Sequence, residues 1–283
     1  MRRSPALAVL LGILVTAQVW LSAELGAVRG AMAEQTELAP PLPAAALKLL
    51  SLEYDNLVAD LIFSRTLSFH GGKLHRNERS TPETWRIIVD RLGAASELDP
   101  RFVDPYYFAQ SALTWEAGMP AEANRLLDRG MRARSDDWEI PFFMGFNAFY
   151  FLHDNASGSS YLMEASRRPG SPRWIGLLAA RLGSKSGATE TAVVFLEQLA
   201  ARTEDEATRA EIIKRAEAMR GILTIERAVG RYYAGFGTMP ADLQALMDKG
   251  ILDRLPGDPY GGRFYLNASG KVWTTSDLRP VSP

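Results

Sequence analysis

Apolar residues recur at three- and four-residue spacing from about residue 44 to about residue 235, and Gly and Pro punctuate this stretch without interrupting it. Such spacing is typical of amphipathic helices that bury one face. No convincing run of strand residues occurs there. Within it, the segment from Leu47 to Phe69 predicts a helix that begins near Glu53 and ends at the glycine pair Gly71-Gly72. The pattern therefore predicts a mainly α fold.

A repeated unit underlies these helices. A glycine is followed five residues later by alanine and four residues after that by leucine in two places, residues 118–127 and residues 187–196. The segments 153–165 and 83–95 fit the same frame, so the anchors at positions 83, 118, 153 and 187 are spaced by 35, 35 and 34 residues. Self-similarity at a fixed spacing is the sequence sign of a repeat architecture.

This spacing resembles the tetratricopeptide repeat, a 34-residue helix-turn-helix unit in which small residues let the two helices approach. The resemblance covers roughly residues 54–203. Phe146 departs from the family's pattern, because a small residue is preferred at its position. The resemblance implies an α-solenoid of about four helix pairs, in which the first helices of successive pairs line a concave face. An unrelated helical bundle is the alternative.

The concave face of such a solenoid would hold a protein partner, because aromatic and Arg side chains carry much of the energy of desolvated interfaces. The identity of the partner stays open. The alternative for each aromatic residue is a place in the core. The resemblance implies a partner-binding set of Phe108, Trp115, Phe143, Asn147, Tyr150 and Arg181.

The C-terminal part changes character. Residues 204–236 predict a long amphipathic helix that begins with acidic residues and caps the repeats. Residues 237–283 are rich in Gly and Pro; there, residues 239–247 predict a short helix, and residues 263–267 and 271–275 alternate as two strands of a hairpin. The stretch from Leu255 to Tyr265, LPGDPYGGRFY, resembles the signature of type II secretion major pseudopilins. That resemblance implies a small α/β tail.

The N-terminus predicts a membrane segment. Arg2 and Arg3 precede an uncharged apolar run over residues 5–23, which as a helix is about 28 Å long and could span a bilayer. The positive-inside rule then predicts a single-pass protein of a bacterial inner membrane, with its body in the periplasm. Cleavage after residues 31–33 (AMA) is the alternative and would release a periplasmic protein. The predicted organisation is an anchor or signal segment at 1–23, a linker at 24–43, repeats at 44–203, a capping helix at 204–236 and the tail at 237–283.

Charge and composition narrow the function. With 32 Lys and Arg against 33 Asp and Glu, the net charge of −1 does not favour nucleic acid as a partner. There are no cysteines and only three histidines, no metal-ligand spacing, no phosphate-binding loop and no nucleophile motif, so we expect no cofactor and no enzyme activity. The sequence predicts a membrane-anchored extracytoplasmic scaffold for a protein partner. Two alternatives remain open, an accessory component of a secretion or pilus machine and an enzyme whose site assembles only in three dimensions.

Overall fold

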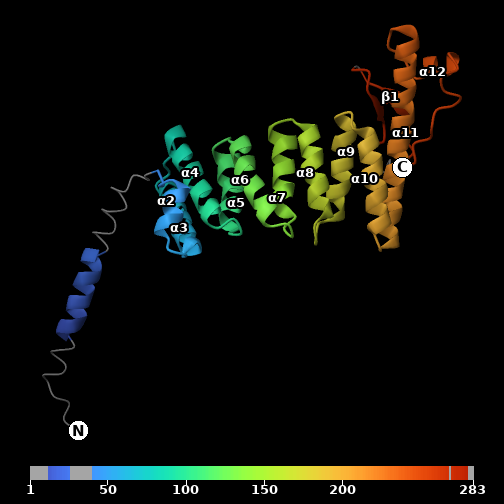
Figure 1. Ribbon diagram of the computed structural model, residues 1–283. Coiled ribbons are helices and arrows are strands. Elements are labelled where there is room, and N and C mark those ends of the chain that lie inside the picture. The colour runs from blue at the N-terminus through green and yellow to red at the C-terminus, as the bar shows by residue number, and fades with distance from the viewer. Residues whose placement is uncertain (1–11, 26–39, 268, 280–283) are drawn as a thin grey trace. The chain divides into compact units, whose positions relative to one another are not determined.

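The computed structural model describes residues 12–25, 40–267 and 269–279 (Figure 1). Helices make up most of these residues, which confirms the mainly α fold class. The chain falls into two compact units, Met1–Asp99 and Pro100–Pro283.

The N-terminal segment is described only in part. Residues 12–25 are helical, whereas residues 5–11 of the predicted apolar run lie outside the described residues, as does the candidate cleavage site at 31–33. Among the helices of the described residues, none is both long enough and apolar enough to cross a membrane.

In the first unit, a short helix is followed by a pair of long helices that pack against each other. Contrary to the sequence prediction, the first long helix does not end at Gly71-Gly72. Neither glycine adopts a positive φ, and the chain leaves the helix only before Asn77, which has a φ of 56°. The second long helix begins after Thr81, whose Oγ1 accepts a hydrogen bond from the N–H of Thr84 at 3.2 Å. The helices are α2 (Ala44–Leu50), α3 (Asp55–His75) and α4 (Pro82–Leu98).

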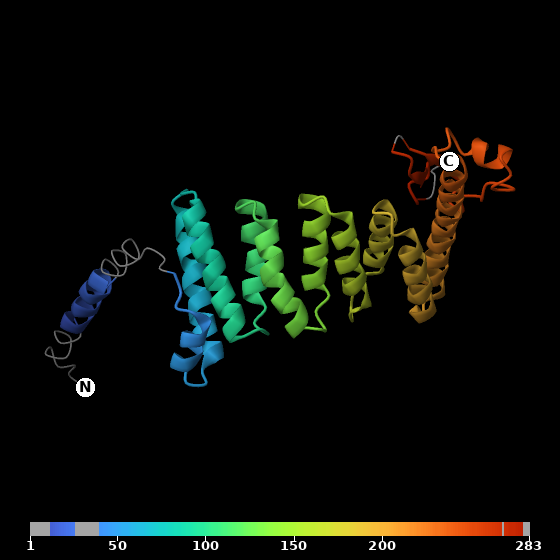
Figure 2. The same ribbon diagram turned by 45° about the horizontal axis from the view of Figure 1, so that its top comes forward.

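In the second unit, helices that follow one another in sequence pack side by side as hairpins (Figures 1 and 2). The first helices of three hairpins begin at Asp104, Glu139 and Arg173, which are 35 and 34 residues apart. The first two of these helices change from α to π winding before they end. Their elements are α5 (Asp104–Phe108), η1 (Ala109–Glu116), α6 (Pro120–Ala133), α7 (Glu139–Phe146), η2 (Asn147–Phe151), α8 (Asn155–Arg167), α9 (Arg173–Lys185) and α10 (Thr189–Arg202).

The turn inside each hairpin explains the repeated glycine. Gly118, His153 and Gly187 each adopt a positive φ, of 65°, 54° and 91°, in connections of three residues. Glycine enters this left-handed region without strain, whereas His153 does so at a cost. The fourth anchor behaves differently, because Glu83 lies in the first turn of α4 and not in a turn between helices. Position 83 therefore does not correspond to the turn position 118, and the predicted 35-residue step between them was wrong.

The long helix α11 (Glu206–Phe236) follows the hairpins, close to the predicted range of 204–236. Asp205 caps its start, since the Asp205 carboxylate accepts a hydrogen bond from the N–H of Thr208 at 2.8 Å. Hydrogen bonds from Thr208 lower the pKa of Asp205. Gly237, with a φ of 70°, ends the helix. A continuous core runs from α8 to α11 and into the tail.

The tail lies beside the C-terminal half of α11 (Figures 1 and 2). Its short helix α12 (Gln244–Asp248) begins later than the predicted residue 239, because the Asp242 carboxylate accepts the N–H of Ala245 and caps the helix at that point. The strands β1 (Phe264–Leu266) and β2 (Val272–Thr274) form an antiparallel hairpin, as predicted, with Tyr265 opposite Trp273.

The stretch from Leu255 to Tyr265 is tied to the rest of the tail through Asp258. One carboxylate oxygen of Asp258 accepts the N–H of Tyr260 at 2.9 Å, and the other accepts hydroxyl hydrogens from Thr274 and from Ser276. A side chain at Gly262 would overlap the Asp258 carboxylate, since its Cβ would lie 2.5 Å from Oδ2. Asp258 therefore ties the loop to the second strand, and glycine at position 262 leaves room for its carboxylate.

The hairpin turns allow backbone conformation to be tested apart from packing. In Gly118→Ala the new Cβ would meet no atom within 4 Å, yet φ is positive, so we expect a loss of about 1 kcal/mol in the free energy of unfolding. Gly230→Ala, in the middle of α11 with equally open space and an ordinary helical φ, should stabilise the protein by roughly 0.5–1 kcal/mol. Urea denaturation followed by circular dichroism measures both, and equal effects would contradict the left-handed turn.

Candidate protein-binding surface

The first helices of two neighbouring hairpins widen into π-helix at corresponding positions. The N–H of Ala117 donates to the carbonyl of Ala112, and the N–H of Leu152 donates to that of Asn147, each across five residues. Such i→i+5 turns are rare and occur frequently at functional sites. The segments η1 and η2 are therefore the first place to look for a binding surface.

Buried amide side chains lie under both π segments. Asn147 is 0% exposed, and its amide exchanges two hydrogen bonds with the amide of Gln110, at 2.7 and 3.1 Å. Its Nδ2 also donates to Asn124 Oδ1 at 2.9 Å. Because a buried amide without partners is costly, this network fixes η1 and η2 against each other. Asn147, predicted to face a partner, therefore lies in the interior and supports the surface from below.

Four aromatic side chains lie together on η1 and on the end of the α7-η2 helix, and we call Trp115, Phe146, Tyr150 and Phe151 the aromatic cluster. Trp115 and Tyr150 are 59% and 53% exposed. The ring centroids of Trp115 and Phe151 are 4.9 Å apart, edge to face, and Phe146 stacks on Tyr150 at 5.2 Å. These are favourable aromatic geometries. The structure thus brings the predicted residues Trp115 and Tyr150 together at the surface.

The aromatic contacts continue toward the third hairpin. The ring centroids of Phe142 and Phe146 are 6.3 Å apart. Phe142 also packs edge to face on Trp174 of α9, with ring centroids 5.5 Å apart. Trp174 is 48% exposed. A band of rings therefore crosses the first helices of all three hairpins. Phe146 was the residue that departed from the repeat pattern, and this departure was the one sequence signal for its role.

Two other predicted residues, Phe143 and Phe108, are less exposed than Trp115 and Tyr150. Phe143 is half-buried and meets the ring of Tyr107 edge to face at 5.5 Å, beside a small core. Burial, together with a hydrogen bond that the Tyr107 hydroxyl donates to Glu139, raises the pKa of Tyr107 well above its ordinary value. Phe108 is also half-buried, in α5. Phe143 therefore contributes to packing, as the alternative interpretation held.

Arg181, the last predicted residue, is bound by the tail. Its guanidinium forms an ion pair with the carboxylate of Asp277, and Trp273 Nε1 donates to the same carboxylate at 3.4 Å. Arg181 and Asp277 are 96 positions apart in sequence. Arg181 therefore helps to hold the β-hairpin on α9.

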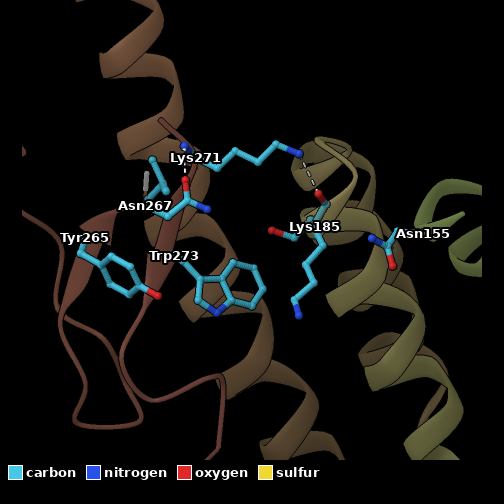
Figure 3. Close-up of a pocket in the computed structure, with 8 residues that line it drawn as sticks. Asn155, Lys185, Tyr265, Asn267, Lys271 and Trp273 are labelled. Carbon is cyan, nitrogen blue, oxygen red and sulfur yellow. Dashed lines mark hydrogen bonds between the residues drawn. The ribbon is translucent and has the colours of Figure 1, made fainter. Parts of the chain in front are cut away.

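A cavity of about 400 Å³ lies between that hairpin and the last turn of α9 (Figure 3). Lys271 of the hairpin donates from Nζ to the carbonyl oxygen of Lys185 at 2.9 Å. The Lys185 ammonium lies 5.5 Å from the ring centroid of Trp273. The cavity is lined by Asn155, Ser184, Lys185, Tyr265, Asn267, Lys271, Val272 and Trp273.

Near this cavity, Glu226 of α11 carries a perturbed carboxyl group. Burial raises the pKa of Glu226 above 4.5, while the hydrogen bond from Thr189 and the charge of Lys271 act in the opposite direction. Thr189 Oγ1 lies 3.0 Å from Glu226 Oε1 and 3.2 Å from Ser184 Oγ. Glu226 is thus a half-buried acid in a short chain of hydroxyl groups.

Across residues 12–25, 40–267 and 269–279, no three His, Asp or Glu side chains are grouped so that they could hold a metal ion. No family model matches the chain, and comparisons with curated proteins and with solved structures give no match either. The aromatic cluster and the cavity beside the hairpin are the features that carry the functional argument.

The buried amides can be tested by a double-mutant cycle. Asn147→Ala leaves the Gln110 amide unpaired in the interior, so we expect it to cost about 1–3 kcal/mol in the free energy of unfolding. The pair of changes Gln110→Leu and Asn147→Leu should cost less than the sum of the two single changes, because both polar partners are removed together. Asn56→Ala on the exposed side of α3 is the control, and additive effects would show that the amides are not coupled.

The carboxyl of Glu226 predicts a pH dependence of stability. Its pKa is higher in the folded than in the unfolded chain, so its contribution is complete below the unfolded pKa and is lost as pH rises through the folded pKa. Glu226→Gln cannot ionise, and it keeps an oxygen that can accept the Thr189 hydroxyl. We expect the wild type to lose stability relative to this variant between about pH 4 and pH 7. Urea denaturation across that range measures the difference, and a difference in stability that does not change with pH would contradict the prediction.

Proposed function

We propose that this protein is a membrane-anchored extracytoplasmic scaffold that binds an apolar, aromatic-rich segment of a protein partner through the aromatic cluster. The observation that carries the proposal is the exposure of Trp115 and Tyr150 within a packed set of rings. Exposed large apolar groups gathered in one place mark interaction sites far more often than scattered ones do.

The geometry of the aromatic cluster favours specific binding over nonspecific apolar association. Trp and Tyr are the residues most enriched among those that dominate binding energy, and each buries roughly 150–250 Å² when covered. Here Trp115 and Tyr150 are already held by Phe146 and Phe151, so they lose little side-chain freedom on binding. The amide network beneath them keeps the two π segments in register.

The arrangement of hairpins supports a solenoid of the tetratricopeptide-repeat kind. Hairpins that begin 35 and 34 residues apart, with left-handed turns at Gly118, His153 and Gly187, are what that repeat requires. In such a solenoid the first helices form the binding face. The band of rings from Trp115 to Trp174 runs along those helices.

The anchoring part of the proposal rests on the sequence. The uncharged run at residues 5–23, preceded by Arg2 and Arg3, favours insertion with the N-terminus in the cytoplasm. The body would then lie in the periplasm of a bacterial cell and present the aromatic cluster there. Cleavage of the segment would leave the binding function unchanged.

A second candidate function is an accessory role in a secretion or pilus machine. It is favoured by the tail, where Asp258 ties the loop to the β-hairpin through residues of the motif that resembles major pseudopilins. In this alternative the tail, and not the aromatic cluster, would contact the machine. Crosslinking from the two surfaces separates the two functions.

The test places a photo-crosslinking residue at Tyr150 in the full-length chain, expressed in membranes. We expect one discrete adduct, absent when the residue is placed at Tyr233, an equally exposed tyrosine on α11. With the purified partner, Trp115→Ala and Tyr150→Ala should each raise Kd about thirtyfold, in line with roughly 2 kcal/mol for a dominant interface residue. Tyr233→Ala should leave Kd unchanged.

Two results would contradict the proposal. The same adducts from positions 150 and 233 would show that the aromatic cluster is not selective. An adduct formed only from a residue of the hairpin, such as Tyr265, would move the function to the tail and support the secretion alternative.

A further inference from the structure

The charged side chains that line the cavity beside the β-hairpin are both positive. Lys185 on α9 and Lys271 on the hairpin both line it, and the Lys271 side chain reaches across to the Lys185 carbonyl (Figure 3). The eight described residues that line it include no carboxylate. Within residues 40–267 and 269–279, the ion pairs include neither Lys185 nor Lys271, whereas the nearby Arg181 is neutralised by Asp277.

Both ammonium groups keep hydrogen-bonding capacity. A lysine ammonium has three donors, and Lys271 uses one of them on the Lys185 carbonyl. Lys185 lies over the face of the Trp273 ring, an interaction that uses its charge but no hydrogen-bond acceptor of the protein. An oxygen anion placed between them would receive charge-assisted hydrogen bonds from both sides.

Asn155, Ser184 and Asn267 line the cavity as well, and the rest of its wall is apolar. Trp273, Val272 and Tyr265 line it, and Figure 3 shows the rings of Tyr265 and Trp273 on the hairpin side, across from Lys185. A volume of about 400 Å³ falls within the roughly 300–1,000 Å³ that is usual for small-molecule sites. The cavity therefore suits one anionic group joined to a compact apolar body.

A singly charged anion fits better than a phosphate. The C-terminal end of α9 lies at the cavity, and the Glu226 carboxyl interacts with the charge of Lys271. Both would oppose a second negative charge. Phosphate sites are also commonly built from Arg side chains, and no Arg lines this cavity.

We propose that the cavity between α9 and the β-hairpin binds a carboxylate attached to an apolar side chain, held by Lys185 and Lys271 and packed on Trp273. Two sources share this chemistry, a free small carboxylic acid and the C-terminal residue of a peptide. The site is separate from the aromatic cluster, so it stands whether or not the proposed scaffold function does.

The experiment uses the full-length chain in detergent and measures binding by saturation-transfer NMR titration. The probes are N-acetyl-leucine, its amide, a peptide that ends in leucine with a free C-terminus, and the same peptide with an amidated C-terminus. We expect saturable binding of the carboxylates, with the amides at least about tenfold weaker. A tighter complex with the free-ended peptide assigns the site to chain termini, and a tighter complex with N-acetyl-leucine assigns it to free acids.

Variants connect the binding to the two ammonium groups. Lys185→Gln keeps the carbonyl that accepts the Lys271 hydrogen bond, so the hairpin should stay in place, and the affinity for the carboxylate should fall about tenfold or more. Lys271→Gln should have a similar effect, with near-UV circular dichroism confirming that the hairpin is folded. Lys249→Gln removes an ammonium that lies 5.4 Å over the Phe236 ring, outside the cavity, and should change nothing.

Four outcomes would overturn the proposal, and three of them concern the carboxylate probes. They are no saturable binding of either carboxylate probe, equal binding of the amides, and an affinity that Lys185→Gln and Lys271→Gln leave intact. Tighter binding of inorganic phosphate than of N-acetyl-leucine would equally overturn it, since it would identify a phosphate site.

Discussion

The pairing of two buried amides is the interaction on which the proposed binding surface depends. Gln110 and Asn147 lie on neighbouring hairpins, 37 positions apart in sequence, and each satisfies the other in an interior where an unpaired amide would be expensive. The pair fixes not only the distance between η1 and η2 but also their rotation, because amide hydrogen bonds are directional. This constraint places Trp115 and Tyr150 together at the surface. Apolar packing alone would hold η1 and η2 less firmly against each other.

The second surface depends on how the tail is held to α9. Asp277 and Leu278 both adopt a positive φ, of 50° and 58°, a conformation that costs free energy for side chains with a Cβ. The surroundings impose it, because Leu278 is completely buried in the core and Asp277 is bound by Arg181. Asp277 also accepts a hydrogen bond from Trp273 of the preceding strand, which lies against Lys185. The cavity is therefore a product of tail docking and would not survive in a chain whose tail is detached.

Local patterns predicted much of this structure and little of its chemistry. Helices, the capping helix and the register of the hairpin follow from spacing, turn residues and caps, all of which act within a few positions. The π segments do not, and the amide contact that joins them lies between two hairpins, where no local pattern encodes it. Asn147 was for this reason placed at the surface although it is buried. The cavity was missed for a similar reason, since Lys185 and Lys271 are 86 positions apart and meet only when the tail folds back. Gly71-Gly72 shows the opposite error, in which a local stop signal is overridden by the packing of α3 on α4.

A single helix, α9, connects the end of the band of rings to the cavity and sets the distance between them. Trp174, at the end of the band of rings, lies in the first turn of α9, and Lys185 ends that helix. Eleven residues at about 1.5 Å each separate the two positions by roughly 17 Å along a rigid element. An extended peptide of about five or six residues covers this length. One polypeptide is thus long enough to place a terminal carboxylate in the cavity and an upstream aromatic residue on the rings. Linked in this way, two contacts of modest affinity would reinforce each other through their effective concentration, so neither site has to be strong by itself.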